Sequence, residues 1–489
     1  MILIVSCVHQ AVGTRKAARN GNPHAYCFAY DAAPCRPPLA RGVASVARPK
    51  LRKQVQSCRH QPPTGLCLLG GGPALRNPMN DIDLYNLSPA IRLMITGLVV
   101  AIGPLAWVWL KSRNAPTAQR LRTLTWVTLF LTFDLIVFGA FTRLTDSGLG
   151  CPDWPGCYGH ASPVGAAQQI SAAQAAMPTG PVTFPKAWIE MIHRYLATGV
   201  GVLILTLAAV AWSQYRRSRL SDAGPTPNGV KLSPAVEASK LEARQAGISP
   251  WWPTFTLLWV CLQGAFGALT VTMKLFPAIV TLHLLGGMVL LALLKVQSVR
   301  YTRVHDGLPL IALQPGTRTL VFATAGLLWL QIALGGWVST NYAVLACTDF
   351  PACQNSMWPA MNFREGFTLW RELGAGLKGE NISFQALTAI HYVHRLSAYV
   401  VFAAMLALAF KLYKIQAMRS AALWLAGLAW LQVATGLGNV LLGWPLAAAV
   451  MHTGGAAALV MVLTGIVCIS RSAEQTVSAS KFSSSRLFA

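Results

Sequence analysis

The stretch AWIEMIHRYLATGVGVLILTLAAVAW, residues 187–212, decides how the rest of this chain is interpreted. It is apolar and long enough to cross a membrane as a helix, yet it carries Glu190, His193 and Arg194 near one end. Such side chains are energetically costly inside a bilayer and usually serve a function there. Because Glu190 and His193 are three residues apart, we expect them on one face of the helix.

The composition of the whole chain is that of a polytopic membrane protein. Of its 489 residues, 54% are hydrophobic and 11% are charged, whereas a soluble domain has roughly 25% charged residues. We expect helices, because lipid forces the backbone groups of each segment to pair internally. Basic loops on one side of the membrane explain the formal net charge of +24, so we expect a lipid bilayer as partner and no nucleic acid.

The sequence contains nine hydrophobic segments of spanning length. They lie at 91–110, 121–143, 187–212, 253–272, 277–298, 318–341, 385–413, 420–442 and 446–470. We predict an all-α polytopic membrane protein with eight core helices and one extra N-terminal helix. Lys and Arg concentrate in alternate connections, which predicts that these connections are cytoplasmic. The long loops 144–186 and 342–384 would then face the periplasm from a bacterial inner (plasma) membrane.

Residues 1–78 differ from the rest of the chain. They contain eleven Lys and Arg against a single acid, Asp31, and five cysteines without metal-ligand spacing. The extra helix would leave this basic tail outside, against the positive-inside rule, so we interpret it as a disordered or non-native extension. The predicted parts that follow are the extra helix and connector at 79–119, the N-terminal half at 120–300, a cytoplasmic linker at 301–317, the C-terminal half at 318–470 and a cytoplasmic tail at 471–489.

The core segments contain an internal repeat. The first half reads GAFTRLTDSGLGCPDWPGC from residue 139, and the second reads GGWVSTNYAVLACTDFPAC from residue 335, which is 196 positions later. QGAFGALT and TLHLLGG, from residues 263 and 281, return 169 positions later as QVATGLGN and VMHTGGA. Two four-helix bundles are therefore predicted as parallel repeats, a symmetry that often places sites within or between the repeats.

One histidine lies in each of the four core segments that run inward from the outer face. They are His193, His283, His394 and His452. Each lies about six to nine residues into its segment, roughly 9–14 Å below the outer end. A lone membrane histidine is commonly a packed, hydrogen-bonded residue, but four at matched depth favour metal ligation. Two imidazoles from facing helices suit a haem iron, whereas zinc requires a tetrahedral set for which only Glu190 is near.

Two further features accompany these histidines. Arg194 and Arg395 each follow the first histidine of a half and are candidates to bind haem propionates, with extension to the membrane interface as the alternative. His391 takes the place of Glu190 in the second half. The carboxylate thus marks the first half as reactive, since a buried carboxylate can take protons or stabilise a developing cation. A structural pairing of Glu190 with Arg194 is the alternative.

Each long outer loop contains a CxxxxxC pair. The pairs are Cys151 with Cys157 and Cys347 with Cys353. Prolines between the cysteines favour tight turns, and the periplasm permits disulfides, so we predict one structural disulfide in each loop. A redox role is a further interpretation for Cys151 and Cys157, which belong to the half that carries Glu190.

These residues together resemble the haem A synthase family. The resemblance covers about residues 120–470 and depends on CPDWPGC (151–157), EMIHR (190–194), TLHLLGG, the second cysteine pair, HYVHR and VMHTGG. It implies oxidation of the C8 methyl group of haem O to a formyl group, by successive hydroxylations, to give haem A for cytochrome oxidase. It also implies haem O synthase and the cytochrome oxidase assembly machinery as partners. The sequence leaves open whether the protein forms a homo-oligomer.

The resemblance also assigns roles to particular residues. His193 and His283 would bind the haem O that is converted, and His394 and His452 would bind a haem b. Glu190 would be required for catalysis, and a Cys151–Cys157 disulfide would be linked to electron transfer. His391 leaves a ligand exchange with His394 open.

Two other functions compete with this one. The first is a bis-His diheme electron-transfer protein of the cytochrome b kind, and the second is a non-enzymatic haem carrier or assembly factor. The first explains the four histidines but neither the presence of Glu190 in one half alone nor the paired loop cysteines, and the second would bind haem weakly without turnover.

Overall fold

In a computed structural model, residues 88–223, 249–307, 309–377 and 379–472 are described. Within these ranges nine helices are long and apolar enough to cross a membrane. They are α2 (Ser88–Ser112), α3 (Thr117–Leu144), α5 (Phe184–Ala223), α7 (Trp251–Thr272), α8 (Pro277–Asp306), α9 (Pro315–Thr340), α11 (Phe384–Tyr413), α12 (Arg419–Leu441) and α13 (Leu446–Ile469). The prediction of an all-α polytopic membrane protein is confirmed. The extension 1–78 and the tail beyond residue 472 lie outside the described residues.

Local sequence signals set several helix ends. The hydroxyl of Ser383 accepts a hydrogen bond from the Ala386 N–H and caps the start of α11. A proline occupies the first turn of both α8 and α9, where its missing N–H leaves no bond unmade. Gly307, with φ of 64°, ends α8 in the left-handed conformation that glycine adopts without steric penalty.

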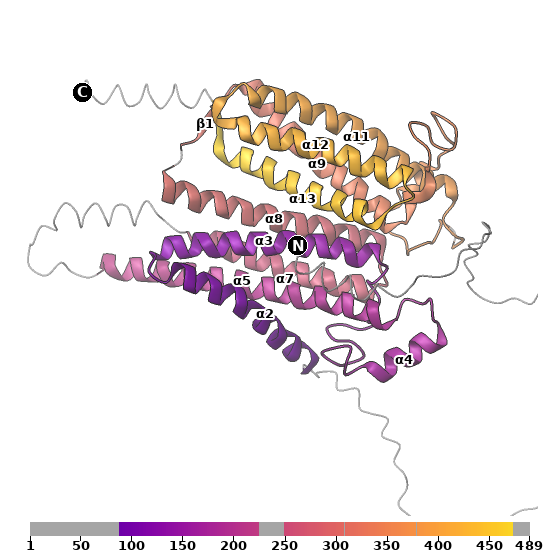
Figure 1. Ribbon diagram of the computed structural model, residues 1–489, viewed down its shortest axis with the longest axis horizontal. Helices are drawn as coiled ribbons and strands as arrows, with labels where there is room; N and C mark the ends of the chain where they lie inside the picture. The colour runs from indigo at the N-terminus through magenta and orange to yellow at the C-terminus, as the bar shows by residue number, and fades with distance from the viewer. Residues whose placement is uncertain (1–87, 224–248, 308, 378, 473–489) are drawn as a thin grey trace, which may run out of the picture. The chain divides into compact units, whose positions relative to one another are not determined.

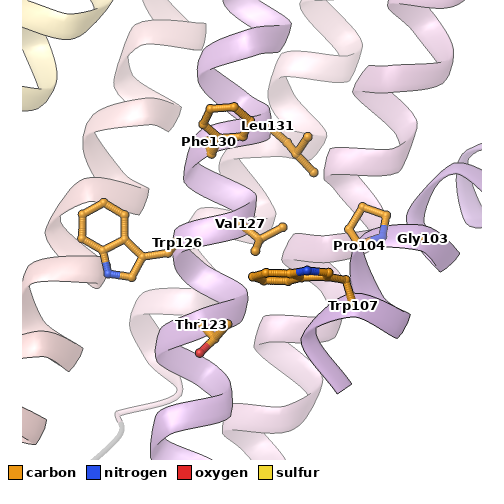
Figure 2. A pocket seen from close by; sticks show the side chains of 8 residues that line it. All are labelled: Gly103, Pro104, Trp107, Thr123, Trp126, Val127, Phe130 and Leu131. Carbon is orange, nitrogen blue, oxygen red and sulfur yellow. The ribbon is translucent and has the colours of Figure 1, made fainter. Parts of the chain in front are cut away.

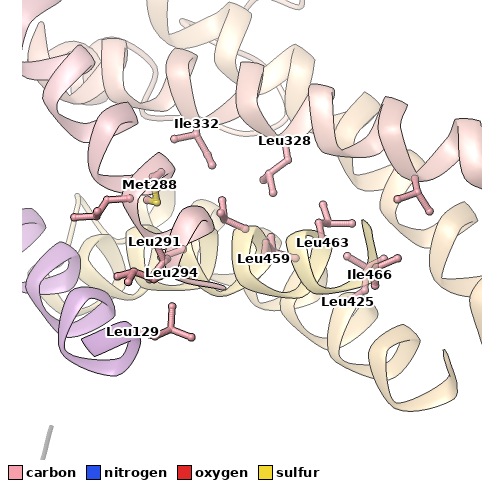
Figure 3. Packing of buried hydrophobic residues seen from close by; sticks show 14 of the residues in the cluster. Leu129, Met288, Leu291, Leu294, Leu328, Ile332, Leu425, Leu459, Leu463 and Ile466 are labelled. Carbon is pink, nitrogen blue, oxygen red and sulfur yellow. The ribbon is translucent and has the colours of Figure 1, made fainter. Parts of the chain in front are cut away.

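The eight core helices pack as two groups of four (Figure 1). In the first group α3 and α7 each contact both α5 and α8, and in the second α9 and α12 each contact both α11 and α13. The groups meet where α13 contacts α3 and α8 and where α8 contacts α9. Buried side chains such as Leu291, Leu294, Leu328, Leu459 and Leu463 fill this junction (Figure 3).

Residues at equivalent repeat positions contact each other at the end of this junction that carries the cysteine loops. Arg143 donates a 2.7 Å hydrogen bond to the carbonyl of Ser339, and the Tyr342 hydroxyl donates a 2.8 Å bond to Asp146. Both pairs are separated by the repeat distance of 196 residues. Contact between equivalent positions is the property of a two-fold interface, so the halves are related by a pseudo-two-fold axis that passes here.

Short elements lie between the spanning helices. The cysteine loops contain α4 (Ala167–Ala176), η2 (Ala343–Ala346) and α10 (Phe363–Gly366), and η3 (Gln416–Met418) precedes α12. β1 (Ile311–Leu313) and β2 (Ser470–Ser472) pair in parallel, although 311–313 were expected to be linker, residue 470 the end of the last helix and 471–472 tail. Elements of three or four residues carry no periodicity that a sequence pattern can reveal.

The extra helix α2 packs across α5. A Cβ on Gly97 would lie 2.3 Å from Thr198, and one on Gly199 would lie 2.9 Å from Val100, so small residues allow the close crossing. α2 and α3 enclose an apolar hollow of about 450 Å³ between Trp107 and the side chains of α3 (Figure 2). The side chains that line it carry no charge, so this hollow offers no groups for chemistry.

Candidate functional site

The four predicted histidines lie at similar depth in helices that all begin at the end with the cysteine loops. His193 and His394 follow the first residues of α5 and α11 by nine and ten positions, and His283 and His452 follow those of α8 and α13 by six. At about 1.5 Å per residue they lie roughly 9–15 Å from these helix ends. His193 lies near His283, and His394 likewise lies near His452.

A glycine of a neighbouring helix packs against the ring edge of each histidine. A Cβ added at each glycine would come close to the histidine Cε1 atom. In the first half the distance would be 3.0 Å from Gly139 to His193 and 3.4 Å from Gly267 to His283. In the second half it would be 2.9 Å from Gly335 to His394 and 3.3 Å from Gly436 to His452. The repeat thus preserves four glycine cradles that hold the imidazoles against a backbone. The sequence showed these glycines, but only the structure identifies what they contact.

The two halves differ in how they hold the second ring nitrogen. The Gln331 amide lies 3.1 Å from Nδ1 of His394, and the Thr435 hydroxyl lies 2.9 Å from Nδ1 of His452. Nδ1 of His193 and Nδ1 of His283 are buried and have no hydrogen-bond partner among the described residues. A partner at Nδ1 fixes the orientation and tautomer of a ligating histidine, so the second half holds its pair more rigidly.

The glycines after His283 and His452 have a packing role. A Cβ on Gly286 would collide with the Gln263 amide, and one on Gly455 with the Gln432 amide. These glycines therefore make room for glutamine side chains of the adjacent helix, and Gln432 donates a 3.0 Å hydrogen bond to the His452 carbonyl.

Glu190 is buried and connects α5 to the first cysteine loop. One carboxylate oxygen accepts a 2.8 Å hydrogen bond from the Cys151 N–H, and the other pairs with Arg194 one turn further along α5. Arg194 in turn donates to the carbonyls of Asp153 (3.0 Å) and Pro155 (3.2 Å). The pairing of Glu190 with Arg194, weighed as an alternative from the sequence, is present, and it makes α5 and the loop one hydrogen-bonded unit.

The second half keeps the arginine of this unit and lacks the carboxylate. Arg395 donates to the carbonyls of Asp349 (2.8 Å) and Ala352 (3.2 Å) in the second cysteine loop. His391 is buried at the position of Glu190, and Nη1 of Arg395 has no hydrogen-bond partner in the part of the chain that the structure describes. Both arginines therefore bind loop carbonyls, and their contact with haem propionates stays a prediction.

Both cysteine pairs form disulfides. Cys151 bonds to Cys157 and Cys347 bonds to Cys353, and all four cysteines are fully buried. An aspartate inside each ring holds the turn: Asp349 accepts 2.8 and 2.9 Å hydrogen bonds from two backbone N–H groups, those of Gln354 and Asn355. The same bonds lower the pKa of Asp349, with that from Asn355 contributing most.

The donor set suits a haem better than a protein-only metal site. Among the described residues, no three of His, Cys, Asp and Glu gather closely enough to hold a metal ion. What each half offers is a pair of imidazoles from two helices, each with its ring edge against a glycine. Two axial imidazoles complete the coordination of a haem iron, whose porphyrin supplies the other ligands.

Comparison with known proteins gives one consistent result. A family model described as "Cytochrome oxidase assembly protein" matches residues 122–464. The heme A synthase of Shewanella oneidensis is 37% identical over 350 residues, which are 70% of this chain and 95% of that protein. The heme A synthase of Alkalihalophilus pseudofirmus is 25% identical over 50% of this chain and 67% of its own length. That of Halalkalibacterium halodurans is 26% identical over 46% of this chain and 61% of its own length.

The matched range begins in α3 and ends in α13, so it contains all eight core helices, both cysteine loops and the four histidines. The family model covers more than half of the chain, and the Shewanella oneidensis protein is matched over nearly its whole length. The chain therefore belongs to the haem A synthase family of cytochrome oxidase assembly proteins.

Proposed function

We propose that this protein is a haem A synthase, a membrane oxidoreductase that converts haem O to haem A by oxidising the C8 methyl group to a formyl group. The family membership supports the reaction. The difference between the halves supports the assignment of roles. Among the described residues, only the first half has a buried carboxylate beside its histidine, and only the second has hydrogen-bond partners at Nδ1.

The two pairs of histidines then have different tasks. His193 and His283 bind the haem O substrate, and their unpartnered Nδ1 atoms suit a group that must enter and leave. His394 and His452 hold a haem b, and the partners Gln331 and Thr435 suit a permanently bound group. A bound haem b supplies one-electron redox chemistry, which the protein tunes through these ligands and their hydrogen bonds.

Glu190 is the residue to which we assign catalysis. Its carboxylate is one helical turn from His193 and is shielded from solvent. In such a site a carboxylate can hold a proton or stabilise positive charge that develops near it. Arg194 and the Cys151 N–H fix its two oxygens, so the negative charge has a defined position.

We infer a redox role for the Cys151–Cys157 disulfide in the same half. Cys151 bonds through its N–H to Glu190, so cleavage of the disulfide would act directly on the catalytic carboxylate. The equivalent Cys347–Cys353 disulfide has His391 in place of the carboxylate, and we assign it a structural role.

The cellular setting follows from the same proposal. The cysteine loops face the periplasm, and the basic ends of the helices face the cytoplasm of a bacterial inner membrane. A haem O synthase delivers the substrate, and the cytochrome oxidase assembly machinery receives the product.

Pigment extraction tests this function. The full chain and its Glu190→Ala variant are expressed with a source of haem O, purified and extracted, and the haems are separated by chromatography. We expect haem A and haem B from the unmodified protein. We expect haem O or a hydroxylated intermediate to accumulate in the variant. Haem B alone would identify a diheme cytochrome, and substoichiometric haem O alone would identify a carrier.

A further inference from the structure

Three arginines lie in elements that gather at the end of the molecule opposite the cysteine loops. Arg303 lies in the last turns of α8, Arg318 in the first turn of α9 and Arg471 in β2. Each has a buried Nε atom without a hydrogen-bond partner, and none forms an ion pair with another described residue. The acid nearest in sequence, Asp306, is already paired with Arg122 at 2.9 Å.

The fold brings the elements that carry these arginines to one corner. Cys468, near the end of α13, lies near Arg303 of α8 and also near Lys295 and Arg300, and Arg471 follows three residues later. In the strand pair, Arg471 lies opposite Ala312, six residues before Arg318, and β2 contacts α9. The short strand pair, which the sequence did not predict, therefore joins the segment that leads into α9 and Arg318 to the segment that carries Arg471.

An apolar slot begins beside this corner and lies between the two halves of the molecule. It has a volume of about 210 Å³ and is lined by α8, α9 and α13. Leu328 of α9 and Leu463 of α13 line it from the two sides and also belong to the core in Figure 3. Cys468 lines the slot, as does Phe322, whose ring lies 5.5 Å from the Arg318 guanidinium. The cations thus lie at the mouth of an apolar space.

All three arginines are half-buried, and a buried Nε–H group without an acceptor is energetically costly until an anion supplies one. The hydroxyl groups of Ser298 and Thr302, within five residues of Arg303 on α8, are also buried and unpartnered within the described residues. We propose that this corner binds one anionic phospholipid, with its phosphodiester on Arg303, Arg318 and Arg471 and an acyl chain in the slot. Arginine binds phosphate oxygens in pairs, and basic pockets between membrane helices at the cytoplasmic surface suit such headgroups.

The dimensions separate this ligand from a haem. Pockets for drug-sized ligands are about 300–1,000 Å³, and the slot is smaller than this range. It therefore accommodates a single chain rather than a macrocycle, although both kinds of molecule are anionic and amphipathic. The lipid would bridge α8 of the first half to α9 and α13 of the second, and it would hold the two halves together at this end.

Native mass spectrometry of the purified full chain tests the proposal. After delipidation in detergent, phosphatidylglycerol or phosphatidylcholine is titrated in, and bound lipid is counted. We expect one phosphatidylglycerol to bind with clear preference. Arg303→Gln, Arg318→Gln and Arg471→Gln should each weaken its affinity about fivefold, the change that ~1 kcal/mol produces. Arg113→Gln is the matched control, because Arg113 is an exposed arginine in the short connector between α2 and α3.

Two further measurements make the result decisive. Val467→Trp fills the slot from α13 without changing charge, and we expect it to reduce phosphatidylglycerol binding at unchanged haem content, which reports intact folding. Glycerol phosphate, added in excess, should not displace the lipid. Equal binding of phosphatidylcholine, full displacement by glycerol phosphate, or unchanged binding in the three arginine variants would each overturn the proposal.

Discussion

The Gln331 amide lies 3.1 Å from Nδ1 of His394, while the equivalent position of the first half is Leu135, and Nδ1 of His193 has no partner among the described residues. The other histidine of each half shows the same change from a polar to an apolar neighbour. The Thr435 hydroxyl lies 2.9 Å from Nδ1 of His452, and the equivalent residue of the first half is Phe266. Both polar partners thus belong to the half that we assign to the permanent haem. The difference between the two sites is in the residues behind the histidines, because the histidines themselves are common to both.

Gln331→Leu should make the second half resemble the first. Removing a hydrogen-bond partner of a ligating histidine commonly lowers affinity for the bound group about 10- to 100-fold. We therefore expect loss of haem b during purification and altered electron paramagnetic resonance of the haem that remains. Leu135→Gln, the reverse change, should slow the release of haem O. Retention of haem b at the unmodified level in Gln331→Leu would contradict this division of roles.

Gly335→Ala should weaken the same haem site by another route. The added methyl group would lie 2.9 Å from Cε1 of His394, which is too close, so the ring must move. Gly326, on the same helix, has nothing within 4 Å of an added Cβ and provides the control. We expect haem b content, measured as the pyridine haemochrome, to fall in Gly335→Ala and to stay unchanged in Gly326→Ala, since alanine favours a helix over glycine by about 1 kcal/mol. Equal haem content in the two variants would show that the cradle does not hold the ring.

The sequence predicted the spanning helices well, because a run of apolar residues reflects the demand of the bilayer on every backbone group. The depth of His193 and His283 followed from the same runs. The partners of Glu190 were harder to predict, since Cys151 is 39 residues away and its N–H carries no sequence signal. The strand pair of β1 and β2 was missed because three-residue strands are specified only by the helices that bring them together.

The second outer loop should depend on pH through Glu365. The hydroxyl of Ser383 contributes most to a lowered pKa of this carboxyl, and the Ser383 N–H also bonds to it, at 2.8 Å. A pKa below the unfolded value of about 4.3 means that the ionised carboxylate stabilises the loop above that pH. This stabilisation is lost as the pH falls through the lower, folded pKa.

Glu365→Gln should therefore make the loop more sensitive to proteolysis at neutral pH, and the difference from the unmodified protein should shrink as the pH falls below about 4. Limited proteolysis in proteoliposomes, with an acid-active protease at low pH, measures the cleavage rate of the loop at each pH. Glu372→Gln, an exposed change in the same loop, is the control. A difference that stays constant down to low pH would mean that ionisation of Glu365 is not its cause.

The two disulfides should respond differently to removal. Replacing both cysteines of either pair by serine should cost about 2–4 kcal/mol of stability, the usual effect of losing a disulfide. We expect haem A formation to stop only when Cys151 and Cys157 are replaced, because that ring bonds to Glu190, the residue to which we assign catalysis. Thermal unfolding and pigment extraction on both double variants separate stability from turnover. Equal loss of haem A in the two would reduce both disulfides to a structural role.

Glu190→Gln separates the structural task of this residue from its chemistry. Glutamine keeps an oxygen that can accept the hydrogen bond from the Cys151 N–H, and Arg194 retains its loop carbonyls, so the loop should stay attached to α5. The negative charge is lost, and with it the stabilisation of positive charge beside His193.

We expect the Glu190→Gln variant to have a normal thermal midpoint and normal total haem, with haem O or a hydroxylated intermediate in place of haem A. His391→Gln, the equivalent change in the second half, should leave the ratio of haem A to haem O unchanged. If Glu190→Gln made haem A at the normal rate, the carboxylate would serve only to hold the loop, and the catalytic group would have to be sought elsewhere in the first half.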